Sequence, residues 1–287
     1  DSMVYEETLT LPDAFDNLAI QAADFQRPTI VVATGDSVFE GTPVGSQLVL
    51  SGLLFTSTNG TLVVPGAIDT IQFVDCTVDP GGGVSSDGHT ARPAGLTIQM
   101  ARANAGGTIS FTRCITGPID AESPGHPTRV LDCIRITDSI VDAQAFGAGA
   151  HAVANATRLL VQRSTLLGEV QCNVLETDLS IVDGTTRVKF RQQGCVRFSY
   201  FAPRSQTPRR YECAPSMPRP VYTSRRFGDP GYTQLALDCQ IAVRTGERGY
   251  EMGVWSSLRN IQRQNHLELR LQDYMPAGLV PEIIFAT

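Results

Sequence analysis

Ile109-Ser-Phe111-Thr-Arg113-Cys114 is the clearest copy of a six-residue pattern that recurs along the chain. In each copy, alternate positions are apolar and a small residue stands at or near the end. The other copies are Leu48-Val-Leu50-Ser-Gly52-Leu53, Ile71-Gln-Phe73-Val-Asp75-Cys76, Ile134-Arg-Ile136-Thr-Asp138-Ser139, Leu159-Leu-Val161-Gln-Arg163-Ser164 and the degraded Leu175-Glu-Thr177-Asp-Leu179-Ser180. Their first residues lie 23, 38, 25, 25 and 16 residues apart. One strand in every period of about 20–25 residues is typical of a parallel β-solenoid.

The alternation within each copy predicts a strand with one buried face. In stacked coils, equivalent side chains form ladders with a spacing of about 4.8 Å. We expect two apolar ladders, Ile71–Ile109–Ile134–Leu159 and Phe73–Phe111–Ile136–Val161, and a ladder of small residues, Cys76–Cys114–Ser139–Ser164, at a tight bend. The predicted fold is therefore all-β, a single-stranded right-handed parallel β-helix. A β-sandwich is the alternative, because its strands also alternate and recur.

The composition divides the chain into four parts. We expect a lead-in over residues 1–28, a β-helix over 29–201, an Arg/Pro-rich connector over 202–232 and a small C-terminal α+β cap over 233–287. The cap is predicted to contain a helix from Trp255 to Tyr274, ended by Pro276, and a strand from Val280 to Phe285. Since an open solenoid end exposes a sheet edge, we expect this unit to cover it. The absence of Met at position 1 predicts that the chain is a piece of a larger protein.

Charge and cysteine content narrow the range of functions. The net charge of −6 disfavours nucleic acid and anionic membranes, which both attract basic surfaces. No apolar run is long enough to span a membrane. The seven cysteines contain no Cys-x-x-Cys pair, so we expect no metal, no cofactor and mostly buried thiols. A disulfide between Cys195 and Cys213 is the alternative for that pair.

Carboxylates recur beside the predicted strands, at Asp75, Asp79, Asp138, Asp142, Asp178 and Asp183. Stacked coils can bring two carboxylates together for acid–base attack on a glycosidic bond. Asp side chains also cap turns by accepting hydrogen bonds from nearby backbone amides, and we favour that role here. No catalytic motif of polysaccharide-cleaving β-helices is complete in the chain.

The connector is the candidate binding segment. Its candidate residues are Arg204, Arg209, Arg210, Tyr211, Arg225 and Arg226. Guanidinium groups with interleaved tyrosines suit phosphate, carboxylate or sugar partners. The alternative is structural: arginines of the connector pair with acidic residues of the solenoid and dock the C-terminal unit onto the last coil.

Three stretches of the C-terminal half carry a family resemblance: Arg191-Gln-Gln-Gly-Cys-Val-Arg-Phe-Ser-Tyr200, Arg226-Phe-Gly-Asp-Pro-Gly-Tyr232, and Glu251-Met-Gly followed by the helix that starts near Leu258. They resemble the C-terminal region of large bacterial proteins associated with gene clusters for phage-tail-like contractile injection particles. The resemblance covers residues 45–287 and is strongest over 191–287. It implies a bacterial chain, in the cytoplasm or in an assembled particle, whose partners are other protein subunits or the rest of a larger chain.

The functional hypothesis that follows is a non-enzymatic structural or binding β-helix module of a larger, particle-associated protein. The alternative is a β-helix that binds or cleaves polysaccharide, as a lyase or a glycoside hydrolase. No catalytic residue is assigned under either hypothesis.

Overall fold

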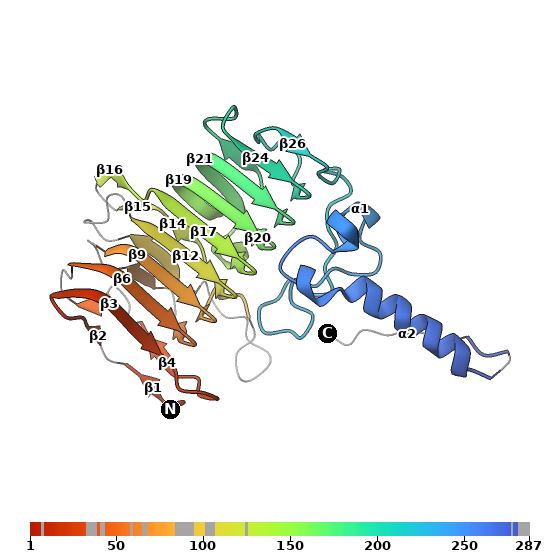
Figure 1. The fold of residues 1–287 in the computed structure, drawn as a ribbon, viewed down its shortest axis with the longest axis horizontal. Coiled ribbons are helices and arrows are strands. Elements are labelled where there is room, and N and C mark those ends of the chain that lie inside the picture. Colours follow the sequence, from red (N-terminus) through yellow and green to blue (C-terminus); the bar gives the residue numbers. More distant parts are fainter. Residues whose placement is uncertain are drawn as a thin grey trace.

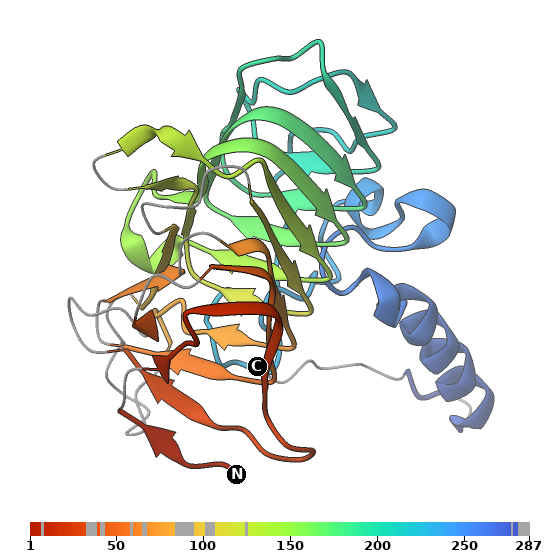
Figure 2. The ribbon, with the colours of Figure 1, turned by 60° about the vertical axis from the view of Figure 1, so that its left-hand side comes forward.

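The chain folds into a stack of β-coils, seen from two directions in Figures 1 and 2. The structure is a computed structural model that describes residues 1–6, 9–32, 39–40, 44–57, 60–64, 68–83, 95–100, 107–123, 126–276 and 278–280. Strands of successive coils pair in parallel throughout the two large sheets. The predicted parallel β-helix is therefore confirmed.

The larger sheet has 13 strands. Its main path runs, in spatial order, β3 (Ala14–Gln21), β6 (Val44–Ser51), β9 (Ile68–Val74), β12 (Thr108–Thr112), β17 (Cys133–Thr137), β19 (His151–Gln162), β21 (Glu169–Asp178), β24 (Gly194–Arg197) and β26 (Arg210–Tyr211). A branch consists of β8 (Thr61–Val64), β11 (Thr97–Met100), β14 (Ile119–Asp120) and β23 (Thr186–Val188). The branch joins the main path through the first halves of the long strands β19 and β21.

The second sheet has nine strands and forms another side of the coils. In spatial order these are β1 (Val4–Tyr5), β4 (Thr29–Val31), β7 (Leu54–Thr56), β10 (Thr77–Val78), β13 (Ile115–Thr116), β18 (Ile140–Asp142), β20 (Thr165–Leu167), β22 (Ile181–Val182) and β25 (Tyr200–Phe201). The remaining pairs are β2 (Leu9–Thr10) with β5 (Phe39–Glu40), and the antiparallel β15 (Glu122–Ser123) with β16 (His126–Val130).

The predicted register is confirmed in both apolar ladders. Ile109 pairs with Ile71 on one side and with Ile134 on the other, and Ile134 pairs with Leu159. The second ladder is aligned in the same way, and the residues of both ladders are 0–2% exposed. The solenoid core is therefore a set of stacked apolar side chains, each in contact with its counterparts in the coils before and after it.

The small-residue ladder is also confirmed, and it contains a chain of hydrogen bonds. The Ser139 hydroxyl donates to the carbonyl of Thr137 in its own coil and accepts the amide of Cys114 in the preceding coil. Ser164 accepts the Ser139 amide in the same manner. Ser180 and Ser199 extend this hydroxyl ladder through the next two coils. Each hydroxyl satisfies a buried backbone amide that no strand partner reaches, so a small polar residue is needed here.

The residue before each member of this ladder has a left-handed backbone. These turn residues are Asp75, Arg113, Asp138, Arg163, Leu179, Phe198 and Glu212, with φ between 44° and 54°, and Gly52 stands at the same place in an earlier coil with φ 71°. A positive φ is uncommon outside glycine. At each of these residues, the chain turns from the large sheet towards the second sheet. We call this column of stacked turn residues the turn column.

The solenoid extends beyond its predicted limits of 29 and 201. At the first end, β1 pairs with β4 and β3 pairs with β6, so much of the expected lead-in is itself part of the first coil. At the other end, β26 pairs in parallel with β24. The first coil carries a copy of the six-residue pattern, Leu18-Ala-Ile20-Gln-Ala22-Ala23, which the prediction overlooked. At the other end, β26 has no such copy.

The chain after β26, called here the C-terminal segment, lies along the side of the solenoid (Figure 1). It contains α1 (Ile241–Arg244), two 3-10 turns (Glu247–Gly249 and Ser256–Leu258) and α2 (Asn260–Tyr274). The Gly253 amide donates to the Leu179 carbonyl, and the Val254 amide donates to the Thr165 hydroxyl. Gly253 has φ +94°, and a Cβ at this position would lie 2.7 Å from Thr165 Oγ1, so only glycine allows this approach.

The expectation that the terminal helix covers the open solenoid end is wrong. The helix α2 projects away from the coils in Figures 1 and 2, and none of its described side chains is buried. Ten of its 15 residues are polar, and its apolar residues Leu267, Leu269 and Tyr274 are exposed. The predicted terminal strand lies outside the described residues except for Val280. Within the described part of the chain, no helix is long and apolar enough to span a membrane.

Candidate functional site

Two rows of side chains line the outer face of the large sheet. In each strand, the residues between the buried ladder positions point outward, because successive side chains alternate between faces. Cross-strand pairing places Arg135, Leu160, Glu176 and Cys195 in one row. The same pairing places Thr137, Gln162, Asp178 and Arg197 in the other row. Strands β17, β19, β21 and β24 therefore carry one residue each in both rows.

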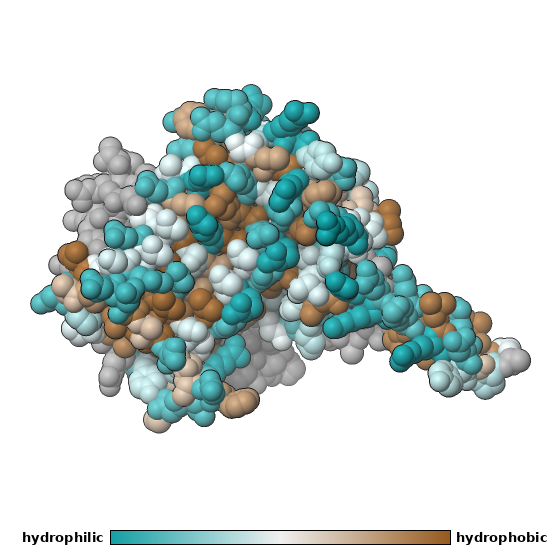
Figure 3. Space-filling view, viewed as in Figure 1, coloured by the Kyte–Doolittle hydropathy of each residue, from teal (hydrophilic) through white to brown (hydrophobic). Residues whose placement is uncertain are grey.

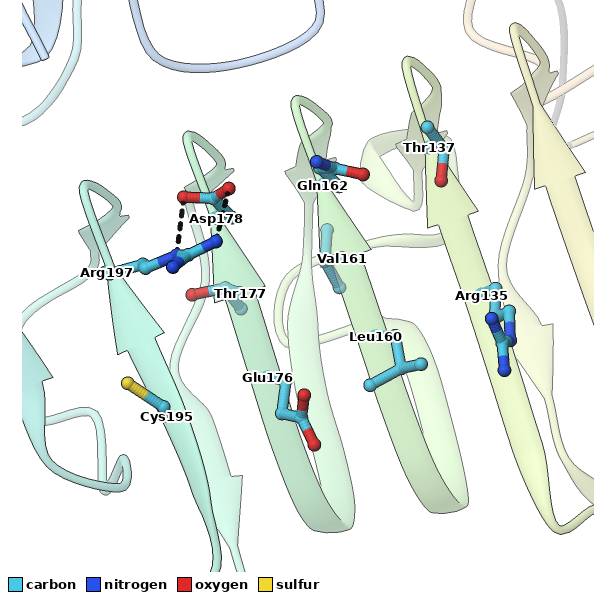
Figure 4. Close-up of a pocket in the computed structure, with 10 residues that line it drawn as sticks. All are labelled: Arg135, Thr137, Leu160, Val161, Gln162, Glu176, Thr177, Asp178, Cys195 and Arg197. Atoms are coloured by element: carbon cyan, nitrogen blue, oxygen red, sulfur yellow. Dashed lines mark hydrogen bonds and ion pairs between the residues drawn. The ribbon is translucent and has the colours of Figure 1, made fainter. Parts of the chain in front are cut away.

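These two rows form a groove with a cavity volume of about 390 Å³, shown in Figure 4. We call it the outer groove. Arg135 lies on one side, Leu160 lies centrally, and Cys195 with Arg197 lies on the other side (Figure 4). Arg135 is exposed and has no ion pair among the described residues. Cys195 is an exposed free thiol.

Both carboxylates of the outer groove are held by arginines. Arg197 donates from Nε and Nη2 to the two oxygens of Asp178, at 3.0 and 3.1 Å. Arg158, just outside the groove, donates to Glu176. A general acid in glycoside cleavage has to carry a transferable proton. The guanidinium of Arg197 occupies both oxygens of Asp178, so the arrangement suits binding better than proton transfer.

The outer face is mixed in polarity. On the face drawn in Figure 3, hydrophilic and hydrophobic residues are interspersed over the solenoid. Obligate protein interfaces are usually more apolar than this. The outer groove instead offers hydrogen-bond donors, acceptors and one aliphatic contact along a line of successive coils.

The six binding residues predicted in the connector are scattered, and none of them lines the outer groove. Arg204, Arg209 and Arg226 expose their side chains and form no ion pair within the described residues. Arg210, in β26, places its guanidinium 5.3 Å from the centre of the Phe201 ring and donates to the Thr207 hydroxyl.

The remaining two candidates make contacts within the fold. The ring of Tyr211 meets Phe198 edge-on, with centroids 5.7 Å apart. Arg225 makes the ion pair that the structural alternative predicted, with 3.0 Å between its Nη1 and Asp183 Oδ2. It also donates to Gln144 and lies over the ring of Tyr222.

The Asp183 carboxylate is the most enclosed acid of this region, and its side chain is fully buried. Burial raises its pKa, while Arg225 and Arg219 act in the opposite direction. Nearby, the Tyr232 hydroxyl donates to Asp142 at 2.6 Å. Two buried acids of the solenoid thus hold the C-terminal segment against its side, whereas the prediction placed the contact on the last coil.

The other carboxylates noted in the sequence divide between two structural roles. Asp79 and Asp142 accept the backbone amide two residues ahead, as the turn-capping interpretation predicts. Asp75 and Asp138 instead pair with arginines of the following coil, as Asp178 does. Sequence reasoning missed these pairs because their partners stand one coil apart.

The cysteines are all free thiols, so Cys195 and Cys213 form no disulfide. Burial raises the pKa of Cys114 and of Cys172 to about 12, which keeps both protonated and unreactive. Most of the cysteines thus serve as small packing residues, as predicted.

The residues of the outer groove were missed because their positions vary in chemistry from coil to coil. The available signal was their place in the repeat: each stands between or just after the two inward positions.

Comparison with known protein families, curated proteins and solved structures found no match to this chain.

Proposed function

We propose that this protein is a structural and binding module, in which a rigid solenoid presents the outer groove to an extended partner. The main observation in support of this proposal is that two rows of outward side chains are aligned across four coils (Figure 4). The spacing of these coils, about 4.8 Å, repeats along the groove. A linear partner with repeating groups can therefore make one contact per coil.

Rigidity supports this role. The coils are joined by parallel ladders and by stacked buried residues. A binding surface on such strands is already ordered before the partner arrives, so binding loses little conformational entropy. The arginine–carboxylate ion pairs likewise order the side chains of the groove before the partner binds.

A place in a larger particle remains part of the proposal. It rests on the resemblance of residues 191–287 to proteins associated with contractile injection clusters. Under this proposal, the partners are protein subunits or another part of a longer chain.

The exposed thiol of Cys195 provides a direct test. Most other thiols are buried, so a maleimide–benzophenone label attached under native conditions should favour Cys195 and place its photoreactive group in the groove. A Cys195→Ala protein serves as the control for label position. Irradiation in an extract of the source cells should yield a discrete cross-linked species, identified by mass spectrometry.

The groove itself is tested by substitution. The double variant Arg135→Glu with Leu160→Arg should abolish the cross-link, because the first substitution reverses a charge and the second fills the groove. Its unfolding midpoint should equal that of the wild type. Arg187→Gln, on an exposed position of β23 outside the groove, should leave the cross-link intact. Cross-linking that is unaffected by the groove variant would refute the proposal.

Polysaccharide cleavage is the second candidate. The observation that favours it is the position of Glu176 and Asp178 two residues apart on one strand, where both point into the groove. Incubation with acidic and neutral polysaccharides should then release reducing ends or unsaturated products. Loss of that release in Asp178→Asn would establish cleavage and replace the binding proposal.

A further inference from the structure

A second groove lies around the corner from the outer groove and shares no lining residue with it. Its cavity volume is about 600 Å³. One wall is the turn column at Arg113, Asp138 and Arg163, and the other is the C-terminal segment at Trp255 and Leu258. We call it the tryptophan groove. Most of its surface is apolar, with charged groups along one edge, which is the usual composition of small-ligand sites.

The charged edge is balanced and retains hydrogen-bonding capacity. Arg113 donates from Nε and Nη2 to both oxygens of Asp75, and Arg163 donates in the same way to Asp138. In each guanidinium the third nitrogen, Nη1, has no hydrogen-bond partner among the described residues. Each carboxylate oxygen that accepts one hydrogen bond retains a second lone pair. The edge therefore offers donors and acceptors in alternation, with no net charge.

Trp255 is held in place beside this edge. Its indole nitrogen donates to the Tyr232 carbonyl at 3.0 Å and to the Thr233 hydroxyl at 3.1 Å. The preceding residue, Val254, is tied to the solenoid through its amide bond to Thr165. With its polar atom already satisfied, the half-buried indole contributes apolar ring surface to the groove.

We propose that the tryptophan groove binds neutral oligosaccharide chains. A pyranose ring has an apolar face of C–H groups that fits against an aromatic ring, and its hydroxyls both donate and accept hydrogen bonds. The indole of Trp255 matches the first property, and the alternating arginines and aspartates match the second. Coil spacing allows sugar hydroxyls to meet Arg113, Asp138 and Arg163 in turn.

The balance of charge selects against an anionic partner. A site for an acidic polymer needs unpaired cations, whereas both arginines here are neutralised by bidentate carboxylates. The two grooves are lined by different residues, so binding at the tryptophan groove does not depend on the outer groove. Failure of one proposal therefore leaves the other standing.

Trp255 is the only tryptophan of the chain, so intrinsic fluorescence reports on this groove alone. Maltohexaose, cellohexaose, mannohexaose and chitohexaose serve as neutral probes, and hexagalacturonate serves as the acidic comparison. At least one neutral probe should shift or quench the emission to saturation, with an affinity that changes little between low and high salt, because no ionic contact forms. Isothermal titration should give the same dissociation constant.

Two outcomes would overturn the proposal. One is that none of the neutral probes produces a fluorescence change or heat at millimolar concentration. The other is that hexagalacturonate alone binds and loses its affinity as salt is added, which would indicate an anion site.

Variants locate the bound sugar. Arg113→Gln should weaken binding by about tenfold through the loss of charge-assisted hydrogen bonds, and its ion pair is exposed enough that folding is retained. Trp255→Phe should retain partial affinity in the calorimeter, whereas Trp255→Ala should lose it. Arg187→Gln, far from this edge in the coil, is the matched control and should bind normally. Equal affinity in all four variants would place the sugar elsewhere and contradict the assignment.

Discussion

The rings of Phe73 and Phe111 stack in adjacent coils, with centroids 5.0 Å apart and ring planes 20° from parallel. Both side chains are fully buried, and they pair directly across β9 and β12. Phe55 meets Phe73 edge-on from the other sheet, with centroids 6.3 Å apart. The aromatic stack thus joins two coils and two sheets at one point of the core.

Truncation of this stack should be strongly destabilising. Phe73→Ala and Phe111→Ala are each expected to lower the free energy of unfolding by about 3–5 kcal/mol, because each leaves a cavity inside a closed solenoid. Urea denaturation followed by circular dichroism measures the loss. The double variant should lose less than the two single losses combined, since the rings contact one another. Strict additivity would show that the stack itself contributes nothing.

The hydroxyl ladder should be sensitive to the loss of a single oxygen. Ser164→Ala leaves the buried amide of Ser139 without an acceptor, and we expect a loss of about 1–3 kcal/mol in the free energy of unfolding. Ser164→Cys is the matched control, because cysteine already occupies this column at Cys76 and Cys114. The cysteine variant should lie between wild type and alanine. If alanine and cysteine have equal effects, cavity formation rather than the hydrogen bond controls the loss.

Arg225 should control the attachment of the C-terminal segment. Arg225→Ala leaves the buried Asp183 charge without its ion-pair partner, at a cost of about 1–3 kcal/mol once the half-exposed arginine is discounted for screening. Limited proteolysis after Tyr211 should then accelerate. Asp183→Asn in the same protein should restore resistance, because it removes the unpaired charge.

The pH dependence of this effect follows from the raised pKa of Asp183. A raised pKa in the folded state means that the folded protein holds the proton more tightly than the unfolded chain does. The destabilisation in Arg225→Ala should therefore shrink in acid, where Asp183 is protonated, and grow as the pH rises. Arg209→Ala with Arg210→Ala should not affect proteolysis at any pH, since neither arginine forms an ion pair with an acid of the described chain.

Glu251 should make the base of α2 sensitive to pH near neutrality. Burial raises the pKa of Glu251 to about 7, while Asn260 donates a hydrogen bond to its Oε1 at 3.1 Å. The stabilising contribution of the protonated form is complete below the ordinary value of 4.5 and is lost as the pH rises through about 7. Hydrogen exchange over residues 250–262, corrected for the intrinsic pH effect, should be faster at pH 8 than at pH 6.

Glu251→Gln tests the cause of this pH dependence. The amide keeps the size and the acceptor oxygen of the protonated acid but does not ionise. The corrected exchange rates should therefore match at pH 6 and pH 8. A variant that retains the wild-type difference would assign the effect to another group.

The repeat made the solenoid core predictable, whereas the contacts of the C-terminal segment with the solenoid were not predictable. Ile109 and Ile134 stand at the same step of the pattern, so their pairing follows from counting residues along the chain. Tyr232 and Asp142 are 90 residues apart and belong to no repeat, and nothing in the local sequence links them. The C-terminal segment was therefore placed on the last coil rather than along the side.

The candidate grooves were harder to predict for a different reason. Inward positions must be apolar and of suitable size, which leaves a clear mark in the sequence. Outward positions such as Arg135 and Leu160 are free to differ, so no pattern marks them. Their arrangement emerges only when the register of four coils is known.

The turn column has a consequence for variation along one edge of the molecule. Its backbone is left-handed in eight successive coils, from Gly52 to Glu212, yet it carries acids, bases, an aromatic and an aliphatic side chain. The left-handed conformation, rather than the identity of the side chain, is what these eight coils share there. The side chains along this edge can therefore be substituted one coil at a time, by mutation or by design, while the core beneath them stays unchanged. The substituted edge would present a new linear order of chemical groups about 4.8 Å apart.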